Sequence, residues 1–159
     1  VKESWNATQH QLYSVKEITN WVKESSAKIA VITGGEPLMY SLDLLTKSLH
    51  EINVQCNIET SACYPWSGSF DWICISPKRF KLPLEENMLK ANELKIIIAH
   101  RNDFRFAEKY ATLVSEKCKL YLQPEWEVEE EVLPQIIEYI KENQQWQISL
   151  QVHKYMNIP

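Results

Sequence analysis

The chain has 159 residues, the usual size of a single domain and long enough to bury a sizeable core. Hydrophobic residues make up 45% of it and charged residues 24%, which is typical of globular proteins. The net charge of -4 argues against a general nucleic-acid or acidic-membrane surface and favours small-molecule chemistry. No apolar run is long enough to span a membrane and the amino terminus lacks a signal-peptide core, so we expect one cytoplasmic domain over residues 1–159.

A helix and a strand are predicted first along the chain. Ser14 and Glu17 fit a capping box, in which both side chains accept hydrogen bonds from amides at a helix start, so a helix should run to about Glu24. The buried stripe of this helix is expected to contain Val15, Ile18, Trp21 and Val22. Residues 28–33 are mostly apolar and include β-branched side chains, which predicts a buried strand.

Strands and helices then alternate to the end of the chain. Further strands are predicted at residues 54–60, 71–75, 93–98, 119–124 and 146–151, with a loop at 61–71 and an irregular segment or short helix at 82–91. Three helices are predicted between these strands. The first covers residues 41–52 and buries Leu42, Leu45, Leu49 and Ile52. The second is capped by Asp103 and buries Phe104, Ala107, Ala111 and Val114, and the third has Pro134 near its start and buries Val132, Ile136, Ile137 and Ile140. This alternation predicts an α/β fold with a parallel sheet and right-handed crossovers.

Polar side chains follow most of the predicted strands. They are Glu36, which follows the glycines Gly34 and Gly35, then Glu59 and Thr60, then Ser76 and Lys78, then Gln123, and finally His153. The carboxyl ends of parallel strands meet at one edge of a sheet, where parallel-sheet and barrel enzymes place their chemistry. We therefore expect a ligand site at this edge.

The segment from Thr33 to Pro37 contains two of the three glycines in the chain. Adjacent glycines let the backbone turn sharply and leave no side chain between the backbone and a bound molecule. A tight strand-to-helix turn with an exposed Glu36 is the plainer interpretation of the same residues.

These residues resemble a known family. Thr33-Gly34-Gly35-Glu36-Pro37 is similar to the glycine-glycine-glutamate motif of radical S-adenosylmethionine enzymes. Four later segments resemble the 7-carboxy-7-deazaguanine synthase family: Asp71 to Lys78, Asn92 to Lys95, Gln123-Pro124 and His153 to Pro159. The resemblance implies a partial parallel β/α barrel of the radical S-adenosylmethionine type that lacks its amino-terminal part.

The resemblance also implies a reaction in queuosine and 7-deazapurine biosynthesis. In this family a reduced 4Fe-4S cluster cleaves S-adenosylmethionine, and the resulting radical starts the ring contraction of 6-carboxy-5,6,7,8-tetrahydropterin to 7-carboxy-7-deazaguanine with loss of ammonia. Because the cofactors carry the radical, no catalytic side chain is assigned. The expected partners are the pterin, an external electron donor and a second copy of the chain in a homodimer.

Site residues follow from the resemblance position by position. The residues implied to bind S-adenosylmethionine are Thr33, Gly34, Gly35, Glu36, Glu59, Thr60, Ser76, Lys78 and Gln123. Thr33, His153 and the terminal carboxylate of Pro159 are implied to face the pterin. A carboxylate and carbonyl oxygens suit the ammonium group of the cofactor, and a fixed chain end suits the guanidine-like edge of the pterin.

The chain departs from the family at the cluster. The family holds its 4Fe-4S cluster with three cysteines on one amino-terminal loop, whereas Cys56, Cys63, Cys74 and Cys118 lie in different predicted elements. We expect buried free thiols, no metal ligands in this chain and no activity without the missing loop. A family threonine that serves Mg²⁺ would fall at Val1 or be lost altogether, so the resemblance leaves Mg²⁺ open.

Other interpretations remain open. The chain could be an activating enzyme that makes a glycyl radical on a partner protein, or a non-catalytic module that binds a pterin or a nucleotide. Lys78 could be an ordinary surface lysine, Glu59 could pair with Lys95 or cap a turn, Ser76 could cap a loop, and His153 could be structural. The acidic residues from Glu125 to Glu131 are expected to form a solvated face.

Overall fold

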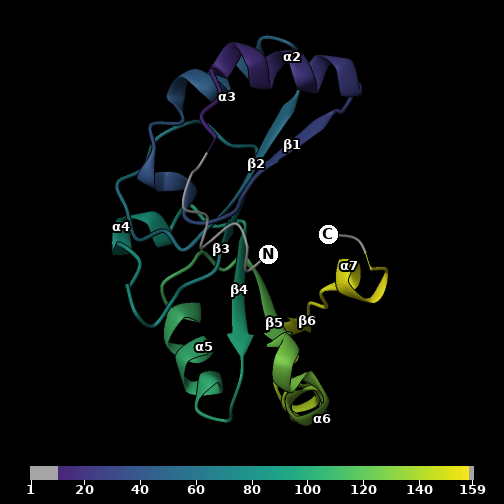
Figure 1. Ribbon diagram of the computed structural model, residues 1–159. Coiled ribbons are helices and arrows are strands. Elements are labelled where there is room, and N and C mark those ends of the chain that lie inside the picture. Colours follow the sequence, from purple (N-terminus) through teal and green to yellow (C-terminus); the bar gives the residue numbers. More distant parts are fainter. Residues whose placement is uncertain (1–10, 158–159) are drawn as a thin grey trace.

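The structure is a computed structural model, and it describes residues 11–157. Six strands form one sheet in chain order, β1 to β6, and every neighbouring pair is parallel. The strands are β1 Ile29–Ile32, β2 Gln55–Thr60, β3 Trp72–Ile75, β4 Glu93–Ile98, β5 Lys119–Pro124 and β6 Trp146–Ile148 (Figure 1). The predicted α/β fold and parallel sheet are confirmed, and the carboxyl ends of all six strands lie at one edge.

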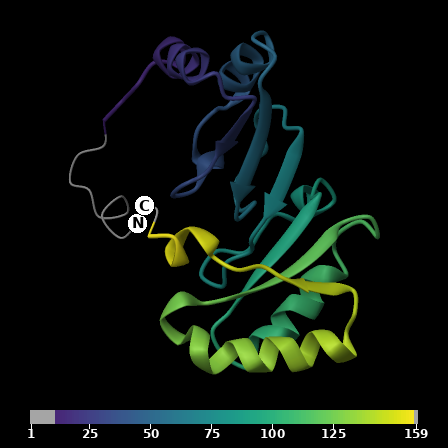
Figure 2. The same cartoon turned by 90° about the vertical axis from the view of Figure 1, so that its right-hand side faces the viewer.

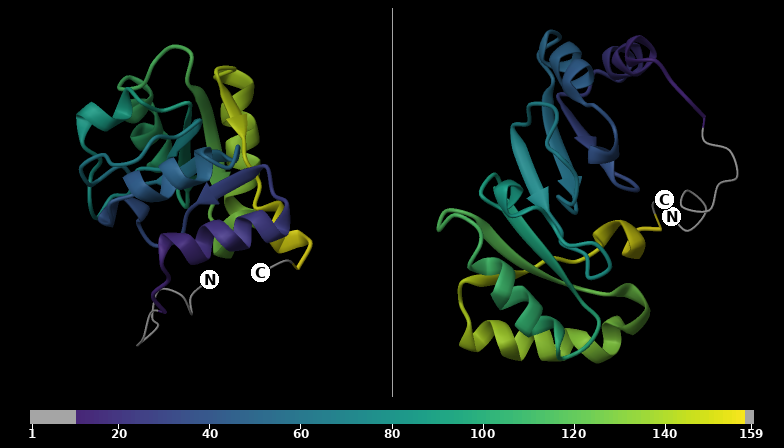
Figure 3. Two further views of the ribbon diagram at one scale, coloured as in Figure 1. Left: turned by 90° about the horizontal axis from the view of Figure 1, so that it is seen from above. Right: turned by 90° about the vertical axis from the view of Figure 1, so that its left-hand side faces the viewer.

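The described helices cover one face of this sheet, except the last, which lies near the carboxyl ends of the strands. They are α2 Val15–Ser25, α3 Asp43–His50, α4 Glu85–Met88, α5 Asp103–Ala111, α6 Glu129–Glu142 and α7 Val152–Tyr155, with short 3-10 helices η1 Pro37–Met39 and η2 Trp126–Val128. Figure 1 shows α2 and α3 beside β1 and β2, and α5 and α6 beside β4 and β5. Figures 2 and 3 show α7 between the start of α6 and the carboxyl ends of β1 and β2.

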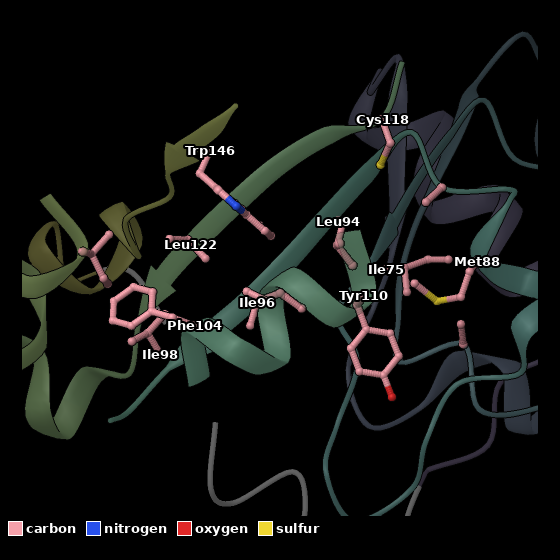
Figure 4. Packing of buried hydrophobic residues seen from close by; sticks show 14 of the residues in the cluster. Ile75, Met88, Leu94, Ile96, Ile98, Phe104, Tyr110, Cys118, Leu122 and Trp146 are labelled. Carbon is pink, nitrogen blue, oxygen red and sulfur yellow. The ribbon is translucent and has the colours of Figure 1, made fainter. Parts of the chain in front are cut away.

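The main core lies between β3 to β6 and helices α4, α5 and α6 (Figure 4). Leu94, Ile96 and Ile98 point to this side of β4 and are almost completely buried. The alternate residues of the same strand are only half-buried, because they point to the other face. The sheet therefore has one apolar face under the helices and one polar, accessible face.

The capping box that begins α2 is confirmed. The hydroxyl of Ser14 accepts a hydrogen bond from the Glu17 amide at 3.2 Å, and the Glu17 carboxylate accepts one from the Ser14 amide at 2.7 Å. These contacts satisfy two amide donors that have no partner within the helix.

Three burial predictions were wrong. Strand β1 is not fully buried, because Ile29 is 51% exposed and Val31 is 54% exposed on the accessible face of an edge strand. Trp21 is 47% exposed at the border of the α2 stripe. Ile137 is 44% exposed, since the stripe of α6 centres on Val132 and Ile136 and turns Ile137 away from the core.

Two predictions about helix starts were also wrong. Asp103 is the first residue of α5, and its carboxylate instead accepts hydrogen bonds from the amides of Ala99 at 2.9 Å and His100 at 3.0 Å. Burial acts to raise the pKa of Asp103, but these bonds and one from Arg79 outweigh it and lower the pKa. Pro134 lies inside α6, because that helix already begins at Glu129.

Candidate functional site

A cavity of about 810 Å³ opens at the carboxyl ends of the strands. Its lining includes ten of the predicted site residues: Thr33, Gly34, Gly35, Glu36, Glu59, Thr60, Ser76, Lys78, Gln123 and His153. The prediction that the polar strand ends come together is therefore confirmed, while the binding role of each residue stays a prediction. Pro159 lies outside the described residues, as does Val1.

The glycine turn after β1 exposes bare backbone to the cavity. Gly34 has φ +85 and Gly35 has φ +37, which is the left-handed region that side chains with a Cβ rarely adopt. A Cβ placed on either residue would meet none of the non-adjacent residues in the described range 11–157 within 4 Å. The space beside the turn is thus open for a ligand that approaches the main chain closely.

The carboxylate of Glu36 is already occupied by protein donors. Its oxygens accept hydrogen bonds from the Leu38 amide at 3.1 Å, the Ser61 amide at 2.8 Å, and the hydroxyls of Thr60 and Ser61. A carboxylate has about four lone-pair positions that can accept hydrogen bonds, and these four bonds occupy them. Glu36 therefore ties the end of β1 to the end of β2, and the backbone of the glycine turn is the free surface beside it.

Lys78 places a positive charge at the cavity wall. Its Nζ donates a hydrogen bond to the Ser76 hydroxyl at 3.2 Å, and Ser76 itself is buried. Burial lowers the pKa of Lys78, and the nearby charge of Lys95 lowers it further. An anionic group bound here would offset the cost of burying the Lys78 ammonium group and its repulsion from Lys95. Lys78 is therefore suited to hold a carboxylate.

The floor of the cavity is a charged network on the accessible face of β2, β3 and β4. Lys95 Nζ lies 3.2 Å from Glu59 Oε2, and the Lys95 side chain is only 14% exposed. Burial acts to lower the pKa of Lys95, but Cys74, Glu59 and Glu93 together raise it. The indole of Trp72 donates to Glu93 at 3.2 Å. Glu59 therefore pairs with Lys95, which was the plainer of the two interpretations of the sequence. It also lines the cavity.

Replacing Lys95 with Met should lower the free energy of unfolding by roughly 1–3 kcal/mol, because it leaves the carboxylates of Glu59 and Glu93 without their cation. Chemical denaturation followed by circular dichroism measures this change. Lys141→Met is the matched control, since Lys141 pairs with Glu138 at 2.6 Å but both side chains are mostly exposed. If both substitutions lowered the free energy of unfolding equally, the pair of Lys95 and Glu59 would contribute no more to stability than a surface ion pair.

The far wall of the cavity comes from the end of the chain. Gln123 at the end of β5 is buried and accepts a hydrogen bond from the Ser149 hydroxyl at 3.4 Å. Gln151 and His153, at the start of α7, line the cavity beyond it. Residues distant in sequence from the glycine turn thus close the opposite side of the same space.

Sequence reasoning missed several lining residues. Glu93, Lys95 and Ile97 lie at alternate positions of β4, and the period of two along a strand could have placed them on the same face as the site. The rim residues Met39, Tyr64, Phe80 and Lys81 come from connecting segments without a recognisable motif. Lys81 Nζ lies 3.3 Å from the centre of the Tyr64 ring, a cation–π contact that sequence spacing does not reveal.

The cysteines do not form a metal site. All four are free and buried, as predicted, and they lie in different parts of the fold. Burial raises the pKa of the Cys56 and Cys118 thiols to about 11, which disfavours the thiolate that a metal requires. Within residues 11–157, no group of three or more His, Cys, Asp or Glu side chains could hold a metal ion. This part of the chain therefore does not provide the ligands of a 4Fe-4S cluster.

The described segment contains no helix that combines the length and the apolar character needed to cross a membrane. The acidic residues from Glu125 to Glu131 are exposed or half-exposed, in agreement with the predicted solvated face.

Comparisons with known proteins agree with the fold. No protein-family model matches the chain. The 7-carboxy-7-deazaguanine synthase of Flavobacterium psychrophilum is 46% identical over 162 residues, which cover 100% of this chain and 75% of the relative. The synthase of Synechocystis sp. is 43% identical and covers 99% of this chain and 75% of the relative. The crystal structure of QueE from Escherichia coli matches with a TM-score of 0.76 at 28% identity, over 87% of this chain and 64% of that chain. The chain belongs to the 7-carboxy-7-deazaguanine synthase family.

Proposed function

We propose that this chain carries the S-adenosylmethionine and pterin cavity of a 7-carboxy-7-deazaguanine synthase. The whole protein is then a radical S-adenosylmethionine enzyme, a carbon-nitrogen lyase that converts 6-carboxy-5,6,7,8-tetrahydropterin to 7-carboxy-7-deazaguanine in queuosine biosynthesis. The observation that carries the proposal is that one cavity gathers polar side chains from the ends of β1, β2, β3 and β5 and from α7. Membership of the family supports the identity of both ligands.

The near side of the cavity suits S-adenosylmethionine, which supplies the radical that abstracts hydrogen from the pterin. The left-handed glycine turn leaves space where a Cβ would stand, so its carbonyl oxygens can approach the ammonium group of the ligand. Lys78 and Ser76 can hold the carboxylate, and Glu59, Thr60 and Gln123 can bind the ribose hydroxyls. Glu36 serves this side by fixing the turn, because protein donors occupy its carboxylate.

The far side of the cavity suits the pterin. His153 and Thr33 both line the cavity and are the residues proposed to contact the pterin, and Pro159 belongs to the proposal although it lies outside the described residues. The near side follows the ends of packed strands, whereas His153 comes from helix α7 beyond the last strand. Keeping water away from the reacting atoms is the other contribution of this cavity.

The described residues do not supply every component of the proposed enzyme. The cluster ligands do not come from residues 11–157, so we assign no step to the cluster here. An external electron donor, a homodimer and a cytoplasmic location complete the proposal, and Mg²⁺ dependence stays open.

Titration of two variants tests the assignment of the two sides. Lys78→Met should weaken S-adenosylmethionine binding by about tenfold, through loss of a charge-assisted contact, and leave pterin binding unchanged. His153→Ala should weaken pterin binding and leave the cofactor affinity unchanged. Isothermal titration calorimetry under anaerobic conditions measures both affinities.

The outcomes also separate the alternatives. An activating enzyme for a protein radical would bind S-adenosylmethionine but not the pterin. A non-catalytic module would bind a ligand of this cavity without supporting turnover in any form of the protein. Equal effects of both substitutions on both ligands would contradict the two-sided arrangement.

A further inference from the structure

Four side chains fasten the carboxyl-terminal helix to the start of α6, and we call them the aromatic clasp: Trp126, Glu129, Lys154 and Tyr155. The rings of Trp126 and Tyr155 meet edge to face, with centroids 5.3 Å apart and an interplanar angle of 78°. Lys154 Nζ lies 4.8 Å from the centre of the Trp126 ring, and the Tyr155 hydroxyl donates a hydrogen bond to the Glu129 carboxylate. Two residues of α7 thus contact two residues that precede or begin α6.

Helix α7 has little other support among the described residues. None of its residues belongs to a buried core cluster, and Val152, Tyr155 and the following Met156 are all more than half exposed. The backbone hydrogen bonds recorded for Lys154, Met156 and Asn157 are local, to residues 151, 152 and 154. The last recorded backbone bond to the sheet runs from the Ser149 amide to Leu122 at 2.9 Å. The position of α7 therefore depends strongly on the clasp.

Both halves of the clasp continue directly from the cavity wall. Trp126 follows Gln123 by three residues, and Tyr155 follows His153 by two. Gln123 and His153 both line the cavity, whereas Trp126 and Tyr155 do not. The clasp thus joins the segment that follows Gln123 to the helix that carries His153.

We propose that the aromatic clasp positions His153 at the pterin side of the cavity, so that Trp126 and Tyr155 are positioning residues for substrate recognition. This inference rests on the proposed function. Without the clasp, α7 would have to be ordered when the pterin binds, and that ordering would subtract from the affinity. S-adenosylmethionine binds mainly at the opposite side, where the glycine turn is held by Glu36, so its affinity should not depend on the clasp.

Calorimetry and hydrogen exchange on the 159-residue chain test the proposal. Trp126→Ala and Tyr155→Ala should each weaken binding of 6-carboxy-5,6,7,8-tetrahydropterin by about tenfold, with the S-adenosylmethionine affinity within twofold of the unaltered chain. The amides of α7 should exchange at least several-fold faster in both variants. Trp126→Phe keeps an aromatic partner and should restore most of the pterin affinity.

Trp21→Ala is the matched control. Trp21 is also exposed and also meets a tyrosine edge to face, with its ring centroid 4.6 Å from that of Tyr13, but it does not line the cavity. It should change neither affinity nor the exchange of α7. Unchanged α7 exchange in Trp126→Ala would overturn the proposal, and so would equal losses of cofactor and pterin affinity. If the unaltered chain binds no pterin, the proposed function fails, and the exchange experiment still decides whether the clasp holds α7.

Discussion

Replacing Gly35 with Val should reduce the affinity for S-adenosylmethionine by roughly a hundredfold or more, which corresponds to about 2.7 kcal/mol. The new side chain would project from a left-handed backbone position into the open space beside the turn, where no non-adjacent residue that the structure describes lies within 4 Å of a Cβ. It would therefore occupy the volume of the ligand. A β-branched residue at φ +37 is also strained, so the turn itself should shift.

Gly68→Ala separates loss of the site from loss of stability. Gly68 has φ +87, so an alanine there carries a comparable backbone strain, and its Cβ would lie 2.9 Å from Phe70 Cζ. Gly68 does not line the cavity. This variant should unfold at a lower denaturant concentration and keep its cofactor affinity. If Gly35→Val bound S-adenosylmethionine as tightly as the unaltered chain, the glycine turn would not be the cofactor wall.

The second large effect concerns the cluster. After anaerobic reconstitution with iron and sulfide, the 159-residue chain should show neither the absorbance of a 4Fe-4S cluster nor turnover. Its four cysteines are buried in separate parts of the fold, and no described residues form a metal-binding group. A chimera preceded by a three-cysteine cluster loop of the kind that the family resemblance implies should gain both the absorbance and the conversion of pterin to 7-carboxy-7-deazaguanine.

A cysteine-free loop provides the control for this experiment. The same chimera with the loop cysteines replaced by serine should bind S-adenosylmethionine and pterin through the cavity of this chain but produce no product. Cluster assembly and turnover by the 159 residues alone would falsify the assignment of the cluster ligands to another segment.

The order of elements was predictable because it follows from local patterns. The six parallel strands appear where apolar runs end in polar residues, and the capping box of Ser14 and Glu17 begins α2 as expected. Parallel pairing then brings the strand ends together whatever the details of packing. This is why Lys78 and Gln123, far apart in sequence, could both be assigned to one site before their positions were known.

Exposure and side-chain partners were less predictable because they depend on neighbours in space. Val31 has the sequence character of a buried strand residue, yet it lies on an edge strand and is 54% exposed. Glu36 accepts hydrogen bonds from four protein donors, which include groups of residues 60 and 61 that only the pairing of β1 with β2 brings near. The aromatic clasp joins residues 29 positions apart in sequence, Trp126 and Tyr155, and no spacing rule connects them.

If this chain contains the S-adenosylmethionine wall and the pterin wall of one cavity, the unaltered chain should bind both ligands. Anaerobic calorimetry should detect one S-adenosylmethionine per chain, and then one 6-carboxy-5,6,7,8-tetrahydropterin per chain in the presence of saturating cofactor. We expect both ligands to bind to the same chain at the same time. Failure to bind either ligand, or displacement of one by the other, would contradict it.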